Sequence, residues 1–456
     1  MRSHEANMNT FERVSVNGLH MVLINGYHVP VDLAVLSQLY RQAHARLQEC
    51  YHPEEGLTVS ETGTYSQQLW ARDAGAGGFG ADPQMLWQTL NTFLSYQREG
   101  GEIPYRIERV DHVRRFRLKW TRRLGFDLTV RKQAEPIYRN SRYASAVCDT
   151  VPILVVTYAQ SRKYHISLTA DDVRVLSQLD NAVAHEEERF YDREFRLFNL
   201  PNVSDWMDDV SVSGYRTFTN LLWWRAYKVL GRFHQRASRQ AKDDFTKDSH
   251  REKASLYRLK ARVLYRSIKT NLMHPDGYLR AAADDERVDA ASSVLHVIFS
   301  DGREEKLKTL TSLEHLRTRS GMLRNFDRGY SWYQYRFWFR VFGFTKFANS
   351  HVYPWLNHLE LLGRIQVMDL SSEASVRETL SLVMKVAKVH NSNGDFHEVV
   401  TDTTAKPAIH RILGVKVYES TAGFLASVGT WIAAMDALAE RLGVPPSELF
   451  APSQPP

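Results

Sequence analysis

Residues 146–158 read AVCDTVPILVVTY, a strongly apolar stretch that a single acid, Asp149, introduces. Apolar side chains recur at helical spacing from Val147 to Tyr164, which predicts a helix buried on most of its surface. The next predicted helix, residues 173–190, is rich in charges and has apolar residues on one side only, as in a half-buried helix. A buried helix followed by a half-buried one is the unit from which an inner and an outer ring can be built.

The same alternation continues along the chain. Strongly apolar segments begin near residues 31, 83, 146, 213, 286, 350 and 419, roughly 50 to 75 residues apart, and no consensus repeats between them. More charged helices lie between these segments. The pattern predicts a mainly α fold, an (α/α)6 toroid over residues 31–445. The predicted helices are 33–51, 85–96, 147–164, 173–190, 221–234, 256–273, 288–299, 307–316, 352–367, 376–390 and 422–442.

The two ends of the chain differ from this pattern. Residues 1–30 alternate and contain Asn17-Gly18 and Asn25-Gly26, the dipeptide most typical of tight hairpins, which predicts a small β-meander packed on the barrel. Residues 446–456 accumulate prolines and are expected to form a flexible tail. An α-solenoid would also pair helices, but its connections are short, whereas the connections here are long and rich in Gly, Asp, Trp and Tyr.

Composition excludes several classes of protein. The 456 residues carry a net charge of +7, and the two cysteines exclude a disulfide framework. With no apolar leader and no apolar run of ~18 residues, a soluble cytoplasmic protein is expected, without membrane partners. The basic stretches 114–123 and 131–142 suit a nucleic-acid surface or a solvated loop face, and the lack of a stacking platform favours the latter. Neither metal-ligand spacing nor a phosphate-binding loop occurs, so we expect no metal or cofactor.

Carboxylates stand among aromatics in the long connections. Arg72-Asp73 follows Trp70, and this pair is either a structural ion pair or part of a ligand pocket. Asp149 either caps its helix or faces a ligand. The run Ser204–Val210 holds Asp205, Asp208 and Asp209 beside Trp206, as either a solvated turn or a cluster whose like charges and apolar wall raise a carboxyl pKa. A fourth group is the run NGDFHE at residues 393–398.

In this order the motifs resemble the six-hairpin glycosidases, which include glucoamylase, the amylo-1,6-glucosidase part of glycogen debranching enzyme, neutral invertase and trehalase. The resemblance spans about residues 60–440. Trp70-Ala71-Arg72-Asp73 is similar to the early sugar-binding loop of that group, and Trp206-Met207-Asp208 to the loop that carries its general acid. Asp395–Glu398 is similar to the loop of the general base. Lys406-Pro407 is kept, but Glu419-Ser420 replaces a Trp-Ser pair and so removes an aromatic wall.

The resemblance implies a glycoside hydrolase with Asp208 as general acid, Asp209 as its nearest rival, and Glu398 as general base. The implied substrate is a small saccharide with an α-glucosidic or sucrose-type bond, cleaved with inversion. Phosphorolysis on the same barrel, or a carbohydrate-binding toroid without activity, is the alternative, and the oligomeric state stays open. The implied substrate-binding residues are Trp70, Arg72, Asp73, Asp149, Trp206, Asp209, Tyr215, Trp355 and Lys406.

Overall fold

The computed structural model describes residues 11–16, 19–61, 65, 68–108, 134–140, 145–165, 167–201, 206, 209–341, 349, 351–412 and 415–451. In this part of the chain, helices are arranged in two concentric rings. Each inner helix contacts the next, and the last contacts the first, so the ring is closed. The inner helices are α2 (Ala71–Gly77), α5 (Thr150–Ser161), α7 (Thr217–Gln240), α9 (Ala290–Phe299), α13 (Pro354–Val367) and α15 (Leu425–Leu442).

The outer ring covers the inner one, and each outer helix alternates with an inner helix along the chain. The outer helices are α1 (Leu33–Glu49), α3 (Pro83–Ser95), α6 (Ala170–Phe190), α8 (Asp244–Asn271), α10 (Arg303–Ser312) and α14 (Glu373–Asn393). Six inner and six outer helices in the described residues confirm the predicted toroid. Every one of the predicted helices is present, and most ends are shifted by a few residues. The larger differences are in α7, which continues six residues past its predicted end at 234, and in α8, which begins twelve residues before its predicted start at 256.

One inner helix was not predicted. α2 reads ARDAGAG, which has no apolar periodicity, so the sequence suggests a loop there and assigns the segments near 31 and 83 to the inner ring. Those segments are α1 and α3, which lie outside. α2 takes the inner position because its small residues allow close packing against α15. A Cβ on Gly429 of α15 would stand 1.9 Å from the carbonyl oxygen of Gly77. Small residues therefore let α2 approach α15 far more closely than an apolar helix could.

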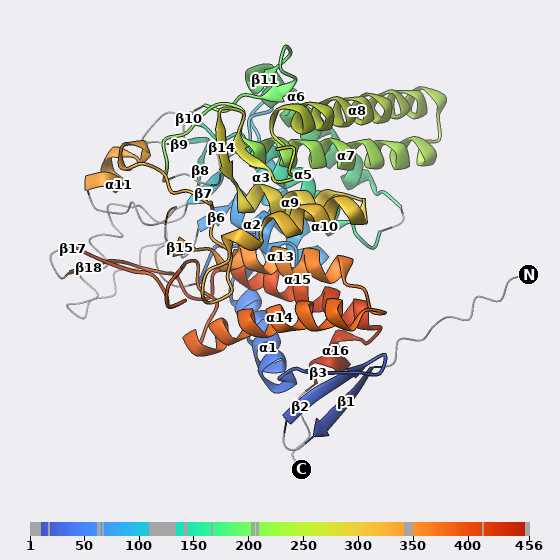
Figure 1. Ribbon diagram of the computed structural model, residues 1–456. Helices are drawn as coiled ribbons and strands as arrows, with labels where there is room; N and C mark the ends of the chain where they lie inside the picture. The colour runs from blue at the N-terminus through green and yellow to red at the C-terminus, as the bar shows by residue number, and fades with distance from the viewer. Residues whose placement is uncertain are drawn as a thin grey trace, which may run out of the picture.

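The inner helices all begin at one end of the barrel, where the long connections lie. At the opposite end the chain turns quickly, for example through residues 241–243 between α7 and α8. Short antiparallel strands lie in the long connections. Figure 1 shows β15, β17 and β18 together at the end of the barrel where the inner helices begin. The paired strands include β6 (Gln68–Trp70) with β7 (Arg106–Glu108) and β8 (Glu135–Ile137), β13 (Arg280–Ala282) with β14 (Asp285–Val288), β15 (His351–Val352) with β16 (Val400–Thr401), and β17 (Ile409–Ile412) with β18 (Val415–Glu419).

Shorter hairpins complete the same set of connections. They are β4 (Tyr51–His52) with β5 (Gly56–Leu57), β9 (Arg139–Asn140) with β10 (Ser145–Ala146), and β11 (Tyr191–Asp192) with β12 (Leu197–Phe198). Two 3₁₀ turns, η2 (Glu314–Leu316) and η3 (Trp332–Gln334), and the short helix α11 (Phe337–Val341) lie in the connection between α10 and α13.

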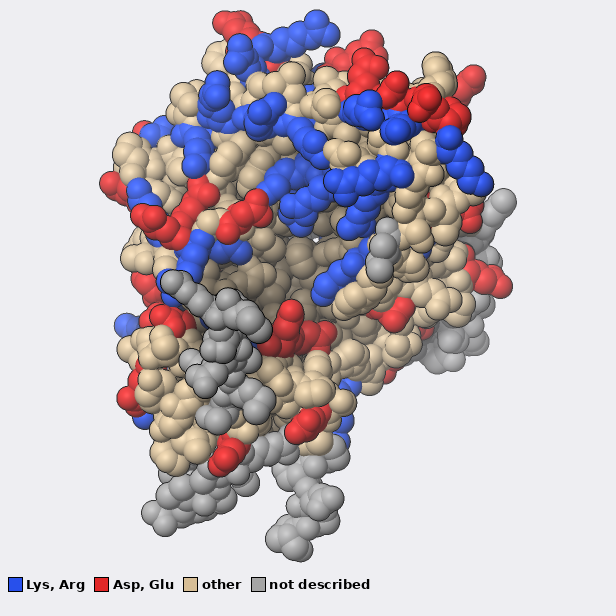
Figure 2. All heavy atoms as spheres, turned by 90° about the vertical axis from the view of Figure 1, so that its right-hand side faces the viewer, with Lys and Arg blue, Asp and Glu red and all other residues tan. Residues whose placement is uncertain are grey.

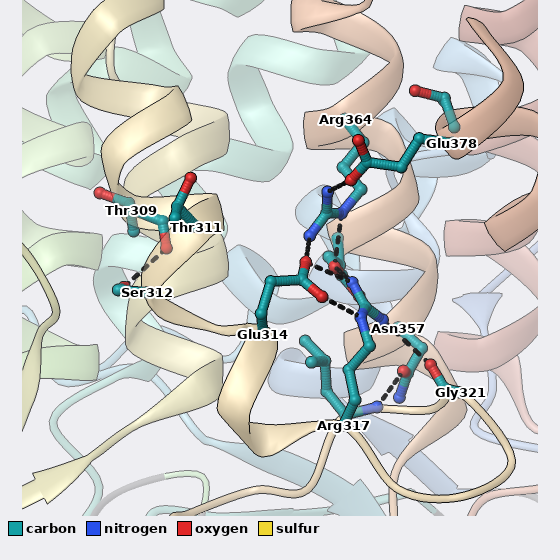
Figure 3. A network of polar contacts seen from close by, with 12 residues as sticks. Thr309, Thr311, Ser312, Glu314, Arg317, Gly321, Asn357, Arg364 and Glu378 are labelled. Carbon is teal, nitrogen blue, oxygen red and sulfur yellow. Dashed lines mark hydrogen bonds and ion pairs between the residues drawn. The ribbon is translucent and has the colours of Figure 1, made fainter. Parts of the chain in front are cut away.

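An ion-pair network holds α13 against its outer neighbours (Figure 3). Glu360 on α13 is 1% exposed and accepts hydrogen bonds from Arg317 and, over 2.7 Å, from Arg364 Nε. The same two arginines also bind Glu314 of η2. Burial opposes ionisation of Glu314, but the hydrogen bond from Arg317 and the charge of Arg364 outweigh it and lower the pKa of Glu314. The network fixes the helix that begins at the mouth of the barrel.

The chain ends pack on the barrel. Strands β1 (Phe11–Val16), β2 (Leu19–Ile24) and β3 (Tyr27–Pro30) form an antiparallel meander, with Asn25 and Gly26 at φ 49° and 86° in the β2–β3 turn. The segment expected to be a flexible tail begins instead with α16 (Pro446–Leu449), where Leu449 and Phe450 are buried against α15. In the described residues, no helix is both long and apolar enough to cross a bilayer.

Candidate active site

A cavity with a volume of about 160 Å³ opens at the end of the barrel where the inner helices begin. Each inner helix contributes to its wall, as does the late connection that precedes α15. A cavity of about 150 Å³ admits one benzene ring, so one six-membered sugar ring is of the right size. The polar and aromatic residues on the wall are Tyr65, Trp70, Arg72, Asp73, Phe79, Trp206, Phe218, Phe299, Tyr353, Trp355, Glu398 and Phe424.

Glu398 reaches the cavity from the connection between α14 and α15. Its backbone N–H donates to Thr421 O over 2.9 Å, which ties the loop to the start of α15. The Tyr418 hydroxyl of β18 donates to Glu398 Oε2 over 2.9 Å. Burial raises the pKa of Tyr418 well above its ordinary value, and the nearby Glu398 charge adds to this. Tyr418 therefore stays a donor at neutral pH and holds the carboxylate in one orientation.

Arg72 and Asp73 come from the first turn of α2. Arg72 Nε donates to Asp149 Oδ2 over 2.8 Å, and Arg72 Nη1 donates to Trp206 O over 3.4 Å. Asp149 occupies the position before α5, yet its side chain makes no capping hydrogen bond and is 1% exposed. Asp149 thus lies behind Arg72 as its ion-pair partner, while Arg72 and Asp73 line the cavity itself.

Aromatic rings form most of the remaining wall. Trp206 meets Trp355 edge to face, with ring centroids 5.7 Å apart and planes at 87°. Tyr353 meets Trp206 at the same distance from another side. Trp70 donates from Nε1 to Gln68 Oε1 over 2.6 Å, so its ring is fixed as well. Flat apolar rings with a few fixed polar groups are the usual lining of a small-ligand pocket.

Other predicted residues lie elsewhere. Asp208 is outside the described residues. Asp209 is buried and does not line the cavity; its backbone carbonyl accepts from Arg336 N over 3.3 Å. The Tyr215 hydroxyl donates to Asp192 over 2.7 Å, and Lys406 is exposed with its ammonium on Ser392 O. The structure therefore gathers Trp70, Arg72, Asp73, Trp206, Trp355 and Glu398 at one cavity, with Asp149 directly behind, but neither Tyr215 nor Lys406.

Sequence reasoning missed several aromatic residues of this region: Tyr65, Phe79, Phe218, Phe299, Tyr353, Tyr418 and Phe424. Tyr353 precedes Pro354-Trp355 and could have been found from that motif. Phe424 lies four residues after Ser420 and lines the cavity. It thus supplies an aromatic ring near the place where the replacement by Glu419-Ser420 was expected to remove one. Tyr65 gave no signal, because no pattern marks its neighbourhood.

The two basic stretches can be followed only in small part. Residues 114–123 and 131–142 lie mostly in the ranges 109–133 and 141–144, which are outside the described part of the chain. Among the described residues, no group of three or more His, Cys, Asp or Glu side chains is placed to hold a metal ion.

Comparison with known proteins supports the fold through structure alone. Neither a family model nor a curated protein sequence matches the chain. The structure of a glycosidase variant aligns with a TM-score of 0.59 at 16% identity, over 90% of this chain and 98% of the other. A GH63 mannosylglycerate hydrolase from Thermus thermophilus, in complex with glucose, aligns at 0.51 with 13% identity, over 88% and 100%. The chain has the same fold as these structures, an (α/α)6 toroid.

The six-hairpin fold alone does not fix a reaction. A D-mannose isomerase aligns with a TM-score of 0.50 at 11% identity, over 89% of this chain and 97% of the other. One scaffold commonly carries different chemistries. The residues of the cavity, rather than the fold, therefore decide the reaction.

Proposed function

We propose that this protein is a glycoside hydrolase that cleaves an α-glucosidic or sucrose-type bond of a small saccharide. The observation that carries the proposal is the placement of the Glu398 carboxylate, oriented by Tyr418, in the ring-sized aromatic cavity that also contains Arg72 and Asp73. The glycosidase neighbours of the same fold support the reaction class.

The proposed mechanism uses two carboxyl groups. A glycosidic bond breaks through an oxocarbenium-like transition state, which needs a proton for the departing oxygen and water at the anomeric carbon. Asp208 donates the proton, and ionised Glu398 removes a proton from the water on the opposite face. Attack from that face inverts the anomeric configuration. Each of these two contributions is worth roughly 10²–10⁴-fold in rate.

The other residues of the cavity bind the sugar in this proposal. Trp70, Trp206 and Trp355 offer ring faces or edges for the apolar faces of a sugar. Arg72 and Asp73 bind hydroxyl groups through charge-assisted hydrogen bonds. Asp149 acts through Arg72 as a positioning residue, since its carboxylate fixes the guanidinium from behind.

A substrate panel tests the proposal. The purified protein is assayed with maltose, isomaltose, trehalose, sucrose and glucosylglycerate, scoring released monosaccharide, with and without added phosphate. We expect hydrolysis of at least one sugar without phosphate and a loss of at least 100-fold in kcat for Asp208→Asn. Turnover that requires phosphate would assign phosphorolysis, and interconversion of free mannose and fructose without any hydrolysis would assign isomerisation; either result contradicts the proposal.

The stereochemistry is a separate part of the proposal. Proton NMR of the first-formed sugar from an α-glucoside is expected to show the β-anomer before mutarotation. The α-anomer would instead indicate a retaining mechanism, in which Glu398 or its partner attacks the sugar directly.

A further inference from the structure

A second cavity lies at the opposite end of the barrel, where the inner helices end. Its volume is about 860 Å³. Figure 2 shows this face with a central hollow, Lys and Arg side chains along its upper side, Asp and Glu side chains along its lower side and a tan floor. The wall residues come from five inner helices, the turn after α2 and the turn after α5, which contributes Lys163. The apolar ones include Phe79, Val156, Phe299, Leu362 and Ile365.

The cations at this cavity exceed the anions that could neutralise them. Arg225 of α7 lines the wall, and it interacts electrostatically with Arg232 and with Asp301. Lys306 donates to the wall residue Gln366 over 2.7 Å. Lys228 is paired with Asp301 over 2.8 Å. The charges of all four cations interact with Asp301, so one carboxylate is shared among them and the region keeps an excess of positive charge.

Arg225 has no ion pair of its own within the described part of the chain. Its Nε is buried without a hydrogen bond, and among the described residues no carboxylate lies within ion-pair distance of its guanidinium. The guanidinium lies over the ring of Phe299, 5.5 Å from the ring centroid. Burial lowers the pKa of Arg225, and repulsion from Arg232 adds to this. A half-buried cation that lies beside other cations and has no ion pair of its own costs stability.

The opposite wall carries two carboxyl groups, those of Asp436 and Glu440. Asp436 accepts a hydrogen bond from the Tyr40 hydroxyl over 2.6 Å, and burial raises its pKa. Glu440 is exposed to solvent. Arg441 is also on this wall and donates from Nε to Met368 O over 3.1 Å. The Arg225 side of the cavity is therefore more favourable for an anion than the wall that carries Asp436 and Glu440.

We propose that this cavity is a binding site for a small phosphorylated ligand, with the phosphoryl dianion on Arg225 and the organic part over the apolar floor. A guanidinium binds phosphate oxygens in a two-pronged geometry, and the cavity is much larger than a phosphate ion needs. Free phosphate and a sugar phosphate share this chemistry. Both cavities are lined by Phe79, Val156 and Phe299. The ligand would therefore contact side chains that also line the candidate active-site cavity.

The test is calorimetric titration of the full chain with inorganic phosphate and with glucose 6-phosphate, at constant ionic strength set with chloride. Binding of both at a 1:1 ratio is expected. If glucose 6-phosphate binds more tightly, the ligand is a phosphate ester; equal affinities assign free phosphate. Absence of binding by either ligand up to roughly 10 mM, beyond the weak end of specific affinities, overturns the proposal.

Matched variants identify the site. Arg225→Gln is expected to weaken binding at least tenfold, and Arg225→Lys to recover part of the loss. Arg174→Gln removes the same charge from an exposed position on α6 and is expected to change the affinity less than twofold. Arg225→Gln should fold, because it removes a repelled charge, and its melting temperature should be no lower than wild type. A folded Arg225→Gln variant with unchanged affinity contradicts the proposal.

Discussion

Arg72 Nε and Asp149 Oδ2, 2.8 Å apart, join the first turn of α2 to the start of α5 at the mouth of the barrel. The Asp149 side chain is 1% exposed and that of Arg72 22%. Arg72 faces the cavity and Asp149 faces the protein interior. Asp149 therefore fixes the orientation of the Arg72 side chain at the site.

Removing the buried partner tests this relationship. Asp149→Asn leaves the partly buried Arg72 without its counter-charge, and loss of one partner of a buried pair costs about 3–5 kcal/mol. We expect a loss of about 3 kcal/mol in the free energy of unfolding, measured by denaturant titration, and a raised KM. The control Asp171→Asn removes one partner of an exposed pair with Arg174 and is expected to cost less than about 1 kcal/mol. Equal losses in both variants would argue against the positioning role.

The hydrogen bond from Tyr418 to Glu398 gives a prediction about pH. A donor to a carboxylate favours its ionised form, so in Tyr418→Phe the general base should ionise at higher pH. The acidic limb of the kcat–pH profile is expected to move to higher pH, with kcat at the optimum reduced about tenfold. Tyr27→Phe removes a hydroxyl that donates to Ser371 O, remote from the cavity, and should leave the profile in place. An unshifted limb in Tyr418→Phe would separate Tyr418 from the catalytic group.

Glu186 of α6 gives a prediction about stability. Burial raises its pKa to about 8; the charge of Arg189 opposes the shift, and the charges of Glu102 and Asp149 add to it. Its Oε2 has no hydrogen bond. Between pH 4.5 and 8 the unfolded chain ionises at this residue while the folded chain stays protonated. Stability due to protonated Glu186 is therefore complete below pH 4.5 and is lost as the pH rises toward 8.

The variant Glu186→Gln should remove that dependence. We expect it to match wild type at pH 4.5 and to be more stable at pH 8 by a few kcal/mol, since a tenfold change in a protonation equilibrium is worth about 1.4 kcal/mol. Chemical denaturation at several pH values measures the difference. The neighbouring exposed Glu188→Gln is the control and should follow wild type throughout. A Glu186→Gln curve parallel to wild type would show that the group is ionised in the folded protein.

The contact between α2 and α15 gives a packing prediction. Gly429→Ala places a Cβ against the carbonyl of Gly77, which α2 can relieve only by moving away. The gain in helix propensity, about 1 kcal/mol, is too small to compensate, so we expect a loss of more than about 3 kcal/mol or failure to fold. Gly231→Ala on α7 first meets Cγ of Arg258 at 3.3 Å, a flexible side chain, and should change stability by less than about 1 kcal/mol. Similar effects of the two variants would contradict the close packing of α2.

Much of the fold could be predicted because its helices bury apolar faces at regular spacing. The stretch around Val155 shows this, since its periodicity alone indicates a buried helix. The helix α2 could not be predicted in this way, because Gly75 and Gly77 act through close approach to neighbours rather than through apolar area. Apolar periodicity indicates which face of a helix is buried, but it does not indicate how closely another helix approaches.

The same difference between local sequence patterns and long-range contacts applies to the residues of the site. Arg72 and Glu398 belong to short motifs in connections, and the structure brings both to one cavity. Tyr418 was missed because its role depends on the β17–β18 hairpin returning its hydroxyl to Glu398, a long-range contact that no local pattern contains. Tyr215 stands in an equally suggestive motif, yet its hydroxyl is on Asp192.

In the proposed mechanism, Glu398 activates water in the cavity where the inner helices begin. The most direct test of this role is the turnover of Glu398→Gln on the sugar that wild type hydrolyses fastest, together with the affinity of both proteins for that sugar. We predict that kcat falls at least 100-fold while the affinity stays within about threefold, because the amide keeps the size of the side chain. A Glu398→Gln variant that hydrolyses the sugar at the wild-type rate would contradict the claim.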